Sequence, residues 1–148
     1  MARPDILSVA QPTLSWQAAQ EAVAAAARAA AAMGVSVNIA VVDCSGVDAA
    51  FIRMNGAPLI SIGIARDKAY TAVSFGLPTS QWHEALASHS AAVQEGIVLR
   101  PRMVTFGGGL PIVIDGHRVG GIGVSGGSEA EDEQIARAGL QALGLGLA

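Results

Sequence analysis

The chain has 148 residues, of which 51% are hydrophobic and only 14% are charged, and its formal net charge is −3. This length suits one domain, and a chain this apolar is neither a disordered tail nor a charged scaffold. A weakly acidic protein does not neutralise phosphates, so we expect no nucleic-acid partner. The single cysteine, Cys44, excludes an internal disulfide.

The hydrophobic residues are unusually small, because alanine dominates and aromatic residues make up only 4%. Small side chains bury little area each, at about 25 cal/mol per Å², so they stabilise a lone domain weakly. Two interpretations follow. The backbones pack closely within the chain, or part of the alanine and glycine surface is buried between subunits. The second interpretation predicts a homo-oligomer.

We expect neither a targeting segment nor a membrane span. Residues 1–11 lack the apolar core of a signal peptide, and the alanine-rich run 22–32 is short and contains Arg28. The expected location is the cytoplasm.

The first part of the chain predicts a helix and a β-hairpin. Thr13 or Ser15 can cap a helix that ends at Gly34. Alternating hydrophobicity predicts strands over 35–43 and 47–54, joined by a turn.

Helical spacing returns in the middle of the chain. We expect Ser61 to cap a helix that Gly76 closes, followed by a helical stretch from Pro78 that fades near Gly96. Residues 97–104 favour neither a helix nor a central strand, and their Arg-Pro-Arg sequence favours a loop or a sheet edge.

The last part of the chain contains the clearest local signals. Strands over 111–114 and 117–124 flank Asp115-Gly116, which is typical of a type I′ hairpin turn. Ser128 and Glu131 form a capping box for the last helix. Because hairpins join most of the strands, the element order predicts one antiparallel sheet with helices on one or both faces, an α+β domain.

The glycine-rich segment 121–127 matches two catalytic patterns without the context that either requires. The G-x-G-x-x-G pattern binds a dinucleotide only when another strand follows, and here an acidic helix follows. The G-x-S-x-G pattern around Ser125 needs a later histidine, but the last histidine is His117. We interpret the segment as a strand end that lets backbones approach closely.

We expect no metal site. His83 and His89 are six residues apart and lie on different sides of a helix. Glu129, Asp132 and Glu133 share a helical face, but the helix dipole alone favours acids in a first turn.

The dispersed basic residues are better candidates for binding. Arg53 ends a predicted strand, and Lys68 lies in a helix of small and apolar residues. The glycine run 107–109 offers backbone N–H donors for an anion. Two readings stay open: both cations face one anion-binding cleft, or they form salt bridges with Asp43, Asp67 or an acid of the last helix.

Five ordered blocks of the sequence resemble the GlcG/HbpS family, which is often described as haem-binding or haem-degrading. A related unit is the C-terminal domain of PduO-type corrinoid adenosyltransferases. The resemblance runs from about Leu14 to Leu143. Its blocks are VNIAVVDCSG, FIRMNGAP, ARDKAYTAVSF, GGGLPIVIDGHRVGGIGVSGG and EDEQIARAG.

The resemblance implies one GlcG/HbpS-like domain over residues 1–148, with about the first 12 residues as an extended arm. It implies a profilin-like α+β fold in which helices flank a five-stranded antiparallel sheet. It also implies dimers that assemble further, into a tetramer or larger. The cofactor that it suggests is haem or a corrinoid, and the candidate iron ligands by residue type are His83, His89, Tyr70 and Met103.

Three functions follow from these observations. The first is a small-molecule-binding protein that holds a small carboxylate, or a haem- or corrinoid-like ligand, at a subunit boundary. Its expected binding residues are Arg53, Lys68, Thr71, Gly107, Gly108 and Gly109. The alternative is a cofactor-free acid–base enzyme of a catabolic pathway, a tautomerase, isomerase or lyase that acts on a small oxo- or hydroxy-acid. Its base would be Asp43, Glu131 or Asp132. The third is a purely structural oligomer.

Overall fold

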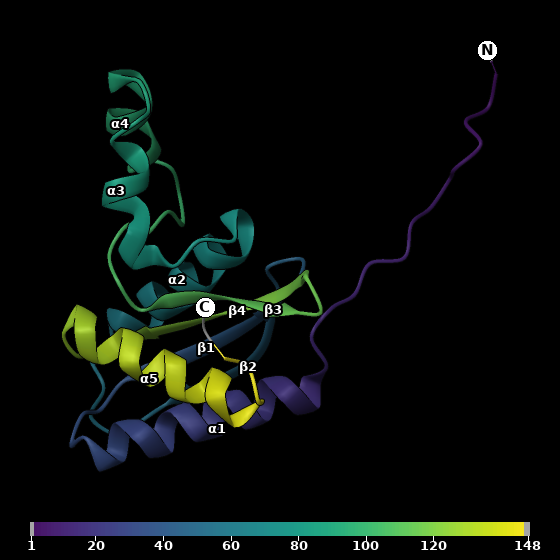
Figure 1. The fold of residues 1–148 in the computed structure, drawn as a ribbon. Helices are drawn as coiled ribbons and strands as arrows, with labels where there is room; N and C mark the ends of the chain where they lie inside the picture. Colours follow the sequence, from purple (N-terminus) through teal and green to yellow (C-terminus); the bar gives the residue numbers. More distant parts are fainter. Residues whose placement is uncertain (1, 147–148) are drawn as a thin grey trace.

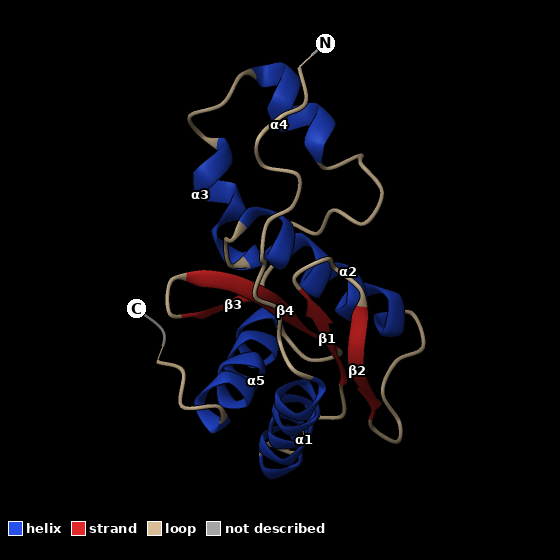
Figure 2. Ribbon diagram, turned by 90° about the vertical axis from the view of Figure 1, so that its right-hand side faces the viewer, coloured by secondary structure: helices blue, strands red, loops and turns tan. Residues whose placement is uncertain are grey.

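A four-stranded antiparallel sheet lies between helices in the computed structural model, which describes residues 2–146 (Figures 1 and 2). The strands lie in the order β2-β1-β4-β3. Helices α1 and α5 cover one face of the sheet, and α2 covers the other. The strands are β1 (Asn38–Asp43), β2 (Asp48–Arg53), β3 (Gly109–Ile114) and β4 (His117–Ser125). The long helices are α1 (Trp16–Ala32), α2 (Ser61–Phe75) and α5 (Glu129–Ala142).

Three short helices form an arm that stands away from the sheet (Figure 1). They are η1 (Thr79–Gln81), α3 (Trp82–Leu86) and α4 (Ala91–Ile97), where a single helical stretch is predicted from the sequence. Trp82 attaches this arm to the body, because its ring packs edge-on against Phe75 with the ring centroids 4.8 Å apart. No residue of α4 is buried.

The expected five-stranded sheet is wrong, because the described residues form four strands. The segment before β3 does not extend into a strand. Pro101 has no N–H donor, and Arg102 has a φ of 67°. The Thr71 hydroxyl then takes the place of a neighbouring strand, because it donates to the Arg102 carbonyl and accepts from the Val104 N–H.

The alternation of β1 separates two hydrophobic clusters. Ile39 and Val41 point into the larger cluster, which α1 and α5 cover. Ala40 and Val42 point to the other face and pack against α2. Helices therefore cover both faces of this central strand, which explains why it is buried along almost its whole length.

Small residues allow close packing within the chain. The inward face of α1 consists of buried alanines and one valine, and it packs against α5. On β4, a Cβ atom at Gly121 would lie 2.5 Å from the Ala69 carbonyl oxygen of α2, and one at Gly123 would lie even closer to the Ala65 carbonyl oxygen of the same helix. Close intrachain packing therefore accounts for this part of the alanine and glycine content.

The structure confirms the helix caps and the hairpin turn that the sequence predicts, with one exception. Ser15 caps α1, the Ser128–Glu131 capping box starts α5, and Asp115-Gly116 turns with two positive φ values, 50° and 78°. The expected cap at Ser61 is wrong, because Ser61 is the first residue of α2 and Ile60 precedes it without a side-chain hydrogen bond.

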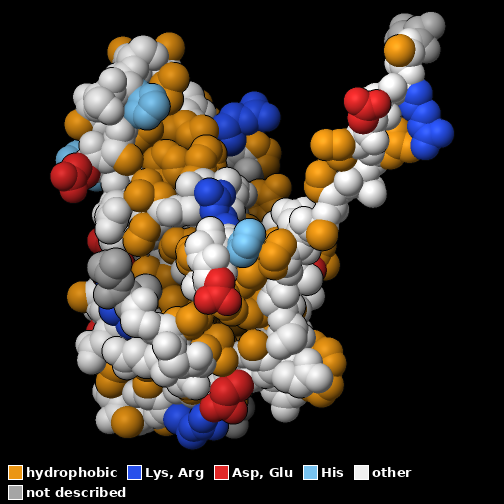
Figure 3. All heavy atoms as spheres, turned by 45° about the vertical axis from the view of Figure 1, so that its right-hand side comes forward, with side chains coloured by type: hydrophobic (Ala, Val, Ile, Leu, Met, Phe, Trp, Pro, Cys, Tyr) orange, Lys and Arg blue, Asp and Glu red, His pale blue; other side chains and the backbone are white. Residues whose placement is uncertain are grey.

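The N-terminal segment extends away from the body (Figures 1 and 3). Residues 2–13 are all exposed, and Leu14 is the first buried residue. The Leu14 N–H donates to the Val119 carbonyl and so fixes the end of the segment beside β4. Among the described residues, no helix combines the length and hydrophobicity that crossing a bilayer requires.

Candidate functional site

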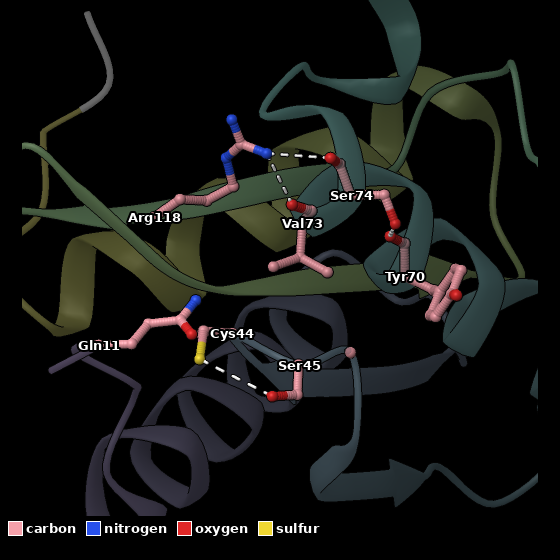
Figure 4. A pocket seen from close by; sticks show the side chains of 8 residues that line it. Gln11, Cys44, Ser45, Tyr70, Val73, Ser74 and Arg118 are labelled. Carbon is pink, nitrogen blue, oxygen red and sulfur yellow. Dashed lines mark hydrogen bonds between the residues drawn. The ribbon is translucent and has the colours of Figure 1, made fainter. Parts of the chain in front are cut away.

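A pocket of about 340 Å³ opens where the N-terminal segment, the β1–β2 turn, α2 and β4 meet (Figure 4). Each of these four segments contributes to its wall, and most of the contributed groups are polar. The lining residues are Gln11, Cys44, Ser45, Gly46, Tyr70, Val73, Ser74 and Arg118.

The β1–β2 turn forms one wall and is held by Asp43. One oxygen of this carboxylate accepts from the Ser45 N–H at 2.8 Å and from the Val47 N–H at 3.2 Å. The Cys44 N–H donates to the Thr13 hydroxyl, which ties the N-terminal segment to the same turn. These bonds place the Cys44 thiol and the Ser45 hydroxyl at the pocket, with 4.0 Å between sulfur and oxygen.

Tyr70 of α2 forms the wall beside this turn. Gly46 has a φ of 77°, and a Cβ at this position would lie 2.9 Å from two carbons of the Tyr70 ring. Only glycine therefore lets the turn approach the ring this closely. The Arg102 guanidinium lies over the Tyr70 ring, 3.8 Å from its centroid, and it also pairs with Asp67 at 3.0 Å.

Arg118 of β4 supplies the positive charge of the pocket. Its Nη1 donates to the Val73 and Ser74 carbonyls at 3.0 Å each, which anchors the side chain at the C-terminal end of α2. A cation at that end also interacts favourably with the helix dipole. Among the described residues, no hydrogen bond or ion pair occupies Nε or Nη2 of this exposed guanidinium, so these donors are available to an anion.

A second, smaller pocket of about 190 Å³ adjoins the first. It shares Tyr70 and Ser74 with the first pocket and is bounded by the loop after α4. Its wall is mainly apolar, with Phe75 and Ile97 among its members, and it includes Met103 together with Arg100 and Arg102.

Lys68, one of the two basic candidates from the sequence, is buried and internally paired. Its Nζ lies 3.1 Å from Asp132 of α5 and donates to the Val124 carbonyl at 2.8 Å. Only 1% of its side chain and 3% of the Asp132 side chain are exposed. Burial lowers the pKa of Lys68 below its ordinary 10.5, although the Asp132 carboxylate opposes this shift. The sequence left two interpretations of Lys68 open, an anion-binding cleft and a salt bridge. The structure favours the salt bridge, with an acid of the last helix as the partner.

The glycine run lies beside this pair, but side chains occupy its outer donors. The Gly107 N–H donates to Glu129 and the Gly109 N–H donates to the Thr79 hydroxyl, both at 2.8 Å. A Cβ at Gly108 would lie 2.7 Å from the Lys68 Nζ, so glycine is needed for the loop to cross the buried amine. The run therefore seals the ion pair.

Arg53 and Thr71 lie apart from that cluster. The Arg53 guanidinium is exposed and donates to the Ala57 carbonyl at 2.8 Å. No hydrogen bond or ion pair among the described residues joins it to Lys68. Thr71 is buried and bonds the backbone at Arg102 and Val104, so its hydroxyl fixes the loop that borders the smaller pocket.

The three candidate bases all accept backbone N–H groups. Asp43 holds the β1–β2 turn, and Glu131 accepts from the Ser128 N–H at 2.9 Å. Asp132 accepts from the Gly127 N–H at 2.9 Å in addition to its pairing with Lys68. Each carboxylate thus has a structural role.

The candidate haem ligands differ in where they lie. His83 and His89 are exposed on the α3–α4 arm, whereas Tyr70 borders both pockets and Met103 borders the smaller one. A tyrosine phenolate and a methionine thioether are both known haem ligand types. Across residues 2–146, no group of three or more His, Cys, Asp and Glu side chains could hold a metal ion.

Sequence reasoning missed Arg118, Ser45 and the role of the Cys44 turn. The positions that form the pocket come from segments far apart in the chain, and no local motif connects them. The usable signal was the glycine at position 46 after an Asp-Cys-Ser turn, which indicates a backbone held close to a neighbour.

Comparison with known proteins places the chain in a family. Residues 14–141 match the model of the family described as "Haem degrading protein HbpS-like". The chain belongs to this family. The resemblance to GlcG and HbpS seen in the sequence is therefore confirmed.

Two relatives illustrate the range of sizes in this group. Protein GlcG of Escherichia coli K12 is 34% identical over 112 residues, which cover 76% of this chain and 81% of GlcG. The corrinoid adenosyltransferase PduO of Salmonella typhimurium is 33% identical over 133 residues, or 90% of this chain. The chain spans only 40% of the length of PduO.

Three crystal structures share the fold. HbpS superposes with a TM-score of 0.83 at 38% identity, covering 98% of this chain and 99% of HbpS. A PduOC–haem complex superposes with a TM-score of 0.82 at 33% identity, covering 90% and 97%. Klebsiella pneumoniae protein ORFY superposes with a TM-score of 0.84 at 28% identity, covering 99% and 100%.

Proposed function

We propose that this HbpS-like protein binds a small anionic molecule in the pocket between Arg118 and the Cys44–Gly46 turn. The observation that carries the proposal is the exposed Arg118 guanidinium, which lines the pocket, is anchored through Nη1 and has no hydrogen bond or ion pair at Nε or Nη2 among the described residues. A guanidinium with free donors suits a carboxylate, since it can offer two parallel hydrogen bonds.

The pocket volume favours a small ligand. About 340 Å³ lies at the lower end of the range for ligand pockets, roughly 300–1,000 Å³. A small carboxylate fits such a space, with the Ser45 hydroxyl and the Tyr70 phenol available as further hydrogen-bonding groups.

A haem- or corrinoid-like ligand would extend beyond this pocket. The adjoining apolar pocket provides a continuation along Tyr70, and Arg100 on its wall could meet an acidic side group of the ring. Tyr70 is then the residue best placed to contact an iron centre, since it borders both pockets. Family membership and the haem-bound PduOC relative support this version, and a second copy of the chain would complete its open side.

Titration of the purified protein tests the proposal. Haemin binding is followed by the Soret band, and binding of small mono- and dicarboxylates is followed by calorimetry. Arg118→Gln is expected to weaken binding by about 10- to 150-fold, because a hydrogen bond to a charged group contributes about 1.5–3 kcal/mol. Arg28→Gln is the matched control, because Arg28 is exposed on α1 far from the pocket wall.

The same titration tests the residues expected from the sequence. If Arg53→Ala weakens binding and Arg118→Gln does not, the ligand lies at the Arg53 end of β2, and the pocket assignment is wrong. A thermal melt of each variant separates loss of affinity from loss of folding.

An acid–base enzyme is the alternative function. The paired Lys68 and Asp132 support it less, since both side chains are almost fully buried and lie outside the two pockets. Turnover of small oxo- or hydroxy-acids that is lost in Asp132→Asn, with folding retained, would favour the enzyme.

A further inference from the structure

A cavity of about 520 Å³ lies beyond the C-terminal end of α2, where the segment after α2, η1, β3, α5 and the C-terminal segment meet. It shares no lining residue with the Arg118 pocket or with the smaller pocket beside that one. Its volume lies within the usual range of small-molecule sites, roughly 300–1,000 Å³. The cavity is therefore a candidate binding site in its own right.

Most of the side chains that line this cavity are apolar. They come from the segment after α2, from β3, from α5 and from the residues that follow α5. They include Leu77, Pro78, Leu110, Val113, Leu140 and Leu145. Val113 is 47% exposed, so an apolar ligand in the cavity would remove water from a side chain that is otherwise hydrated. Such a wall favours a hydrocarbon chain.

Backbone hydrogen bonds hold the C-terminal segment at the cavity. After α5 the chain turns back toward β3 (Figure 2). Gly144 has a φ of 74°, its N–H donates to the Gln141 carbonyl, and the Leu145 N–H donates to the Leu140 carbonyl at 3.1 Å. These two bonds form a Schellman motif, which places the residue after the glycine against the last turn of the helix. Leu145 is thereby fixed beside Leu140 as part of the wall.

Arg137 carries the one charge among the described residues of this wall. Its side chain is 39% exposed, and its Nη2 lies 3.5 Å from Glu133. Glu133 is itself tied to η1, because the Ser80 hydroxyl donates to it at 2.7 Å. Within residues 2–146, no hydrogen bond uses the Arg137 guanidinium, so Nε and Nη1 are available to an acid.

We propose that this cavity binds a medium-chain monocarboxylate, with the carboxylate at Arg137 and the hydrocarbon chain along the apolar wall. One cation beside an apolar cavity matches a molecule with one charged end. A second carboxylate at the far end of the chain would lie against apolar side chains without a partner, which is costly. This site goes beyond the Arg118 pocket, whose wall is mostly polar.

Calorimetric titration with straight-chain acids tests the hydrocarbon part of the proposal. From butyrate through hexanoate to octanoate, each below its micelle concentration, the affinity is expected to rise about fourfold per added CH₂, because each one buries further apolar surface. Adipate has the six carbons of hexanoate but a second carboxylate, and it is expected to bind at least about tenfold more weakly. An affinity that does not change with chain length would overturn the proposal.

Arg137→Gln tests the carboxylate contact. It is expected to weaken octanoate binding by about tenfold, because a charged hydrogen-bond partner is lost. Arg28→Gln is the matched control, since Arg28 is an exposed, ion-paired arginine of α1 that does not line the cavity. If Arg118→Gln weakens octanoate binding and Arg137→Gln does not, the acid occupies the Arg118 pocket. That result overturns this proposal and leaves the proposed function standing.

Val113→Phe tests where the chain lies. The larger side chain reduces the apolar space, so octanoate is expected to lose more affinity than butyrate. Val98→Phe is the control, because Val98 is 45% exposed and lies outside the cavity wall. Equal changes for both acids in Val113→Phe refute the placement, and a thermal melt of each variant separates lost affinity from lost folding.

Amide chemical shifts in NMR spectra of the full chain locate the acid directly. Octanoate is expected to shift the signals of Gln81, Val113 and Leu140, which line the cavity, and to leave those of Cys44 and Ser45 unchanged. Shifts confined to Cys44 and Ser45 assign the acid to the Arg118 pocket, and no shift at either place shows that the chain does not bind it. Both results contradict the proposal.

Discussion

Removing the Asp132 carboxylate is expected to destabilise the fold by about 3–5 kcal/mol, because it leaves the Lys68 ammonium buried without its partner. The structure supplies the conditions for this large effect. The two side chains are 1% and 3% exposed and 3.1 Å apart. Asp132 also accepts the Gly127 N–H, which would lose its partner in the same variant.

Three variants separate the contributions. Asp132→Leu and Lys68→Met are each expected to lower the unfolding midpoint by about 6–20 °C, from the stability loss and the usual scaling for a chain of this size. The double variant is expected to recover much of that loss, because it buries no unpaired charge. Asp48→Asn is the control, since the Asp48–Arg66 pair is about 40% exposed on each side and contributes at most about 1 kcal/mol.

Thermal melts monitored by circular dichroism measure the midpoints, and urea denaturation measures the free energies of unfolding. If the free energy of unfolding of Asp132→Leu lies within about 1 kcal/mol of the wild-type value, which is roughly the contribution of a surface ion pair, the buried ion pair is not a strongly stabilising contact. The reasoning from burial would then be wrong.

Three further predictions concern single residues. Ser128→Ala removes the cap of α5 and is expected to lower the free energy of unfolding by about 1 kcal/mol in urea titrations. Gly46→Ala is expected to destabilise more than Gly34→Ala in the same assay. Both glycines have positive φ, but a side chain at 34 enters open space and one at 46 meets the Tyr70 ring. If the two cost the same, that contact does not constrain the turn. Since burial holds the pKa of Lys68 below 10.5, the unfolded chain binds more protons in the window between the folded pKa and 10.5. The contribution of Lys68 to stability therefore rises with pH through that window, and this rise is absent in Lys68→Met.

Local sequence determined the parts of the fold that depend on a few neighbouring residues. The capping box at Ser128 and the Asp115-Gly116 turn are complete within four residues, so the sequence alone predicts them. The fifth strand came from the family resemblance and is wrong. Its absence depends on Thr71, which bonds a loop more than 30 residues away.

The candidate site was harder to predict, because its contacts cross long stretches of chain. Lys68 and Asp132 are 64 residues apart, and the sequence could name an acid of the last helix only as one of several partners. Arg118 lies next to a hairpin turn, where exposed charged residues are common, so its sequence position does not mark it as a binding residue. Its relation to α2 depends on how β4 lies under that helix, which periodicity does not reveal.

The absence of side chains at Gly121 and Gly123 has a mechanical consequence. With backbone directly against backbone, α2 cannot roll or slide over β4 without steric overlap. The wall that carries Tyr70 and Ser74 is therefore rigid. Adjustment to ligands of different size would fall to the wall that contains Gln11, which belongs to the exposed N-terminal segment beyond the Thr13–Cys44 hydrogen bond. In the proposed binding mode, a rigid wall beside an adaptable one would let a single scaffold accept ligands of several shapes while the guanidinium stays in place.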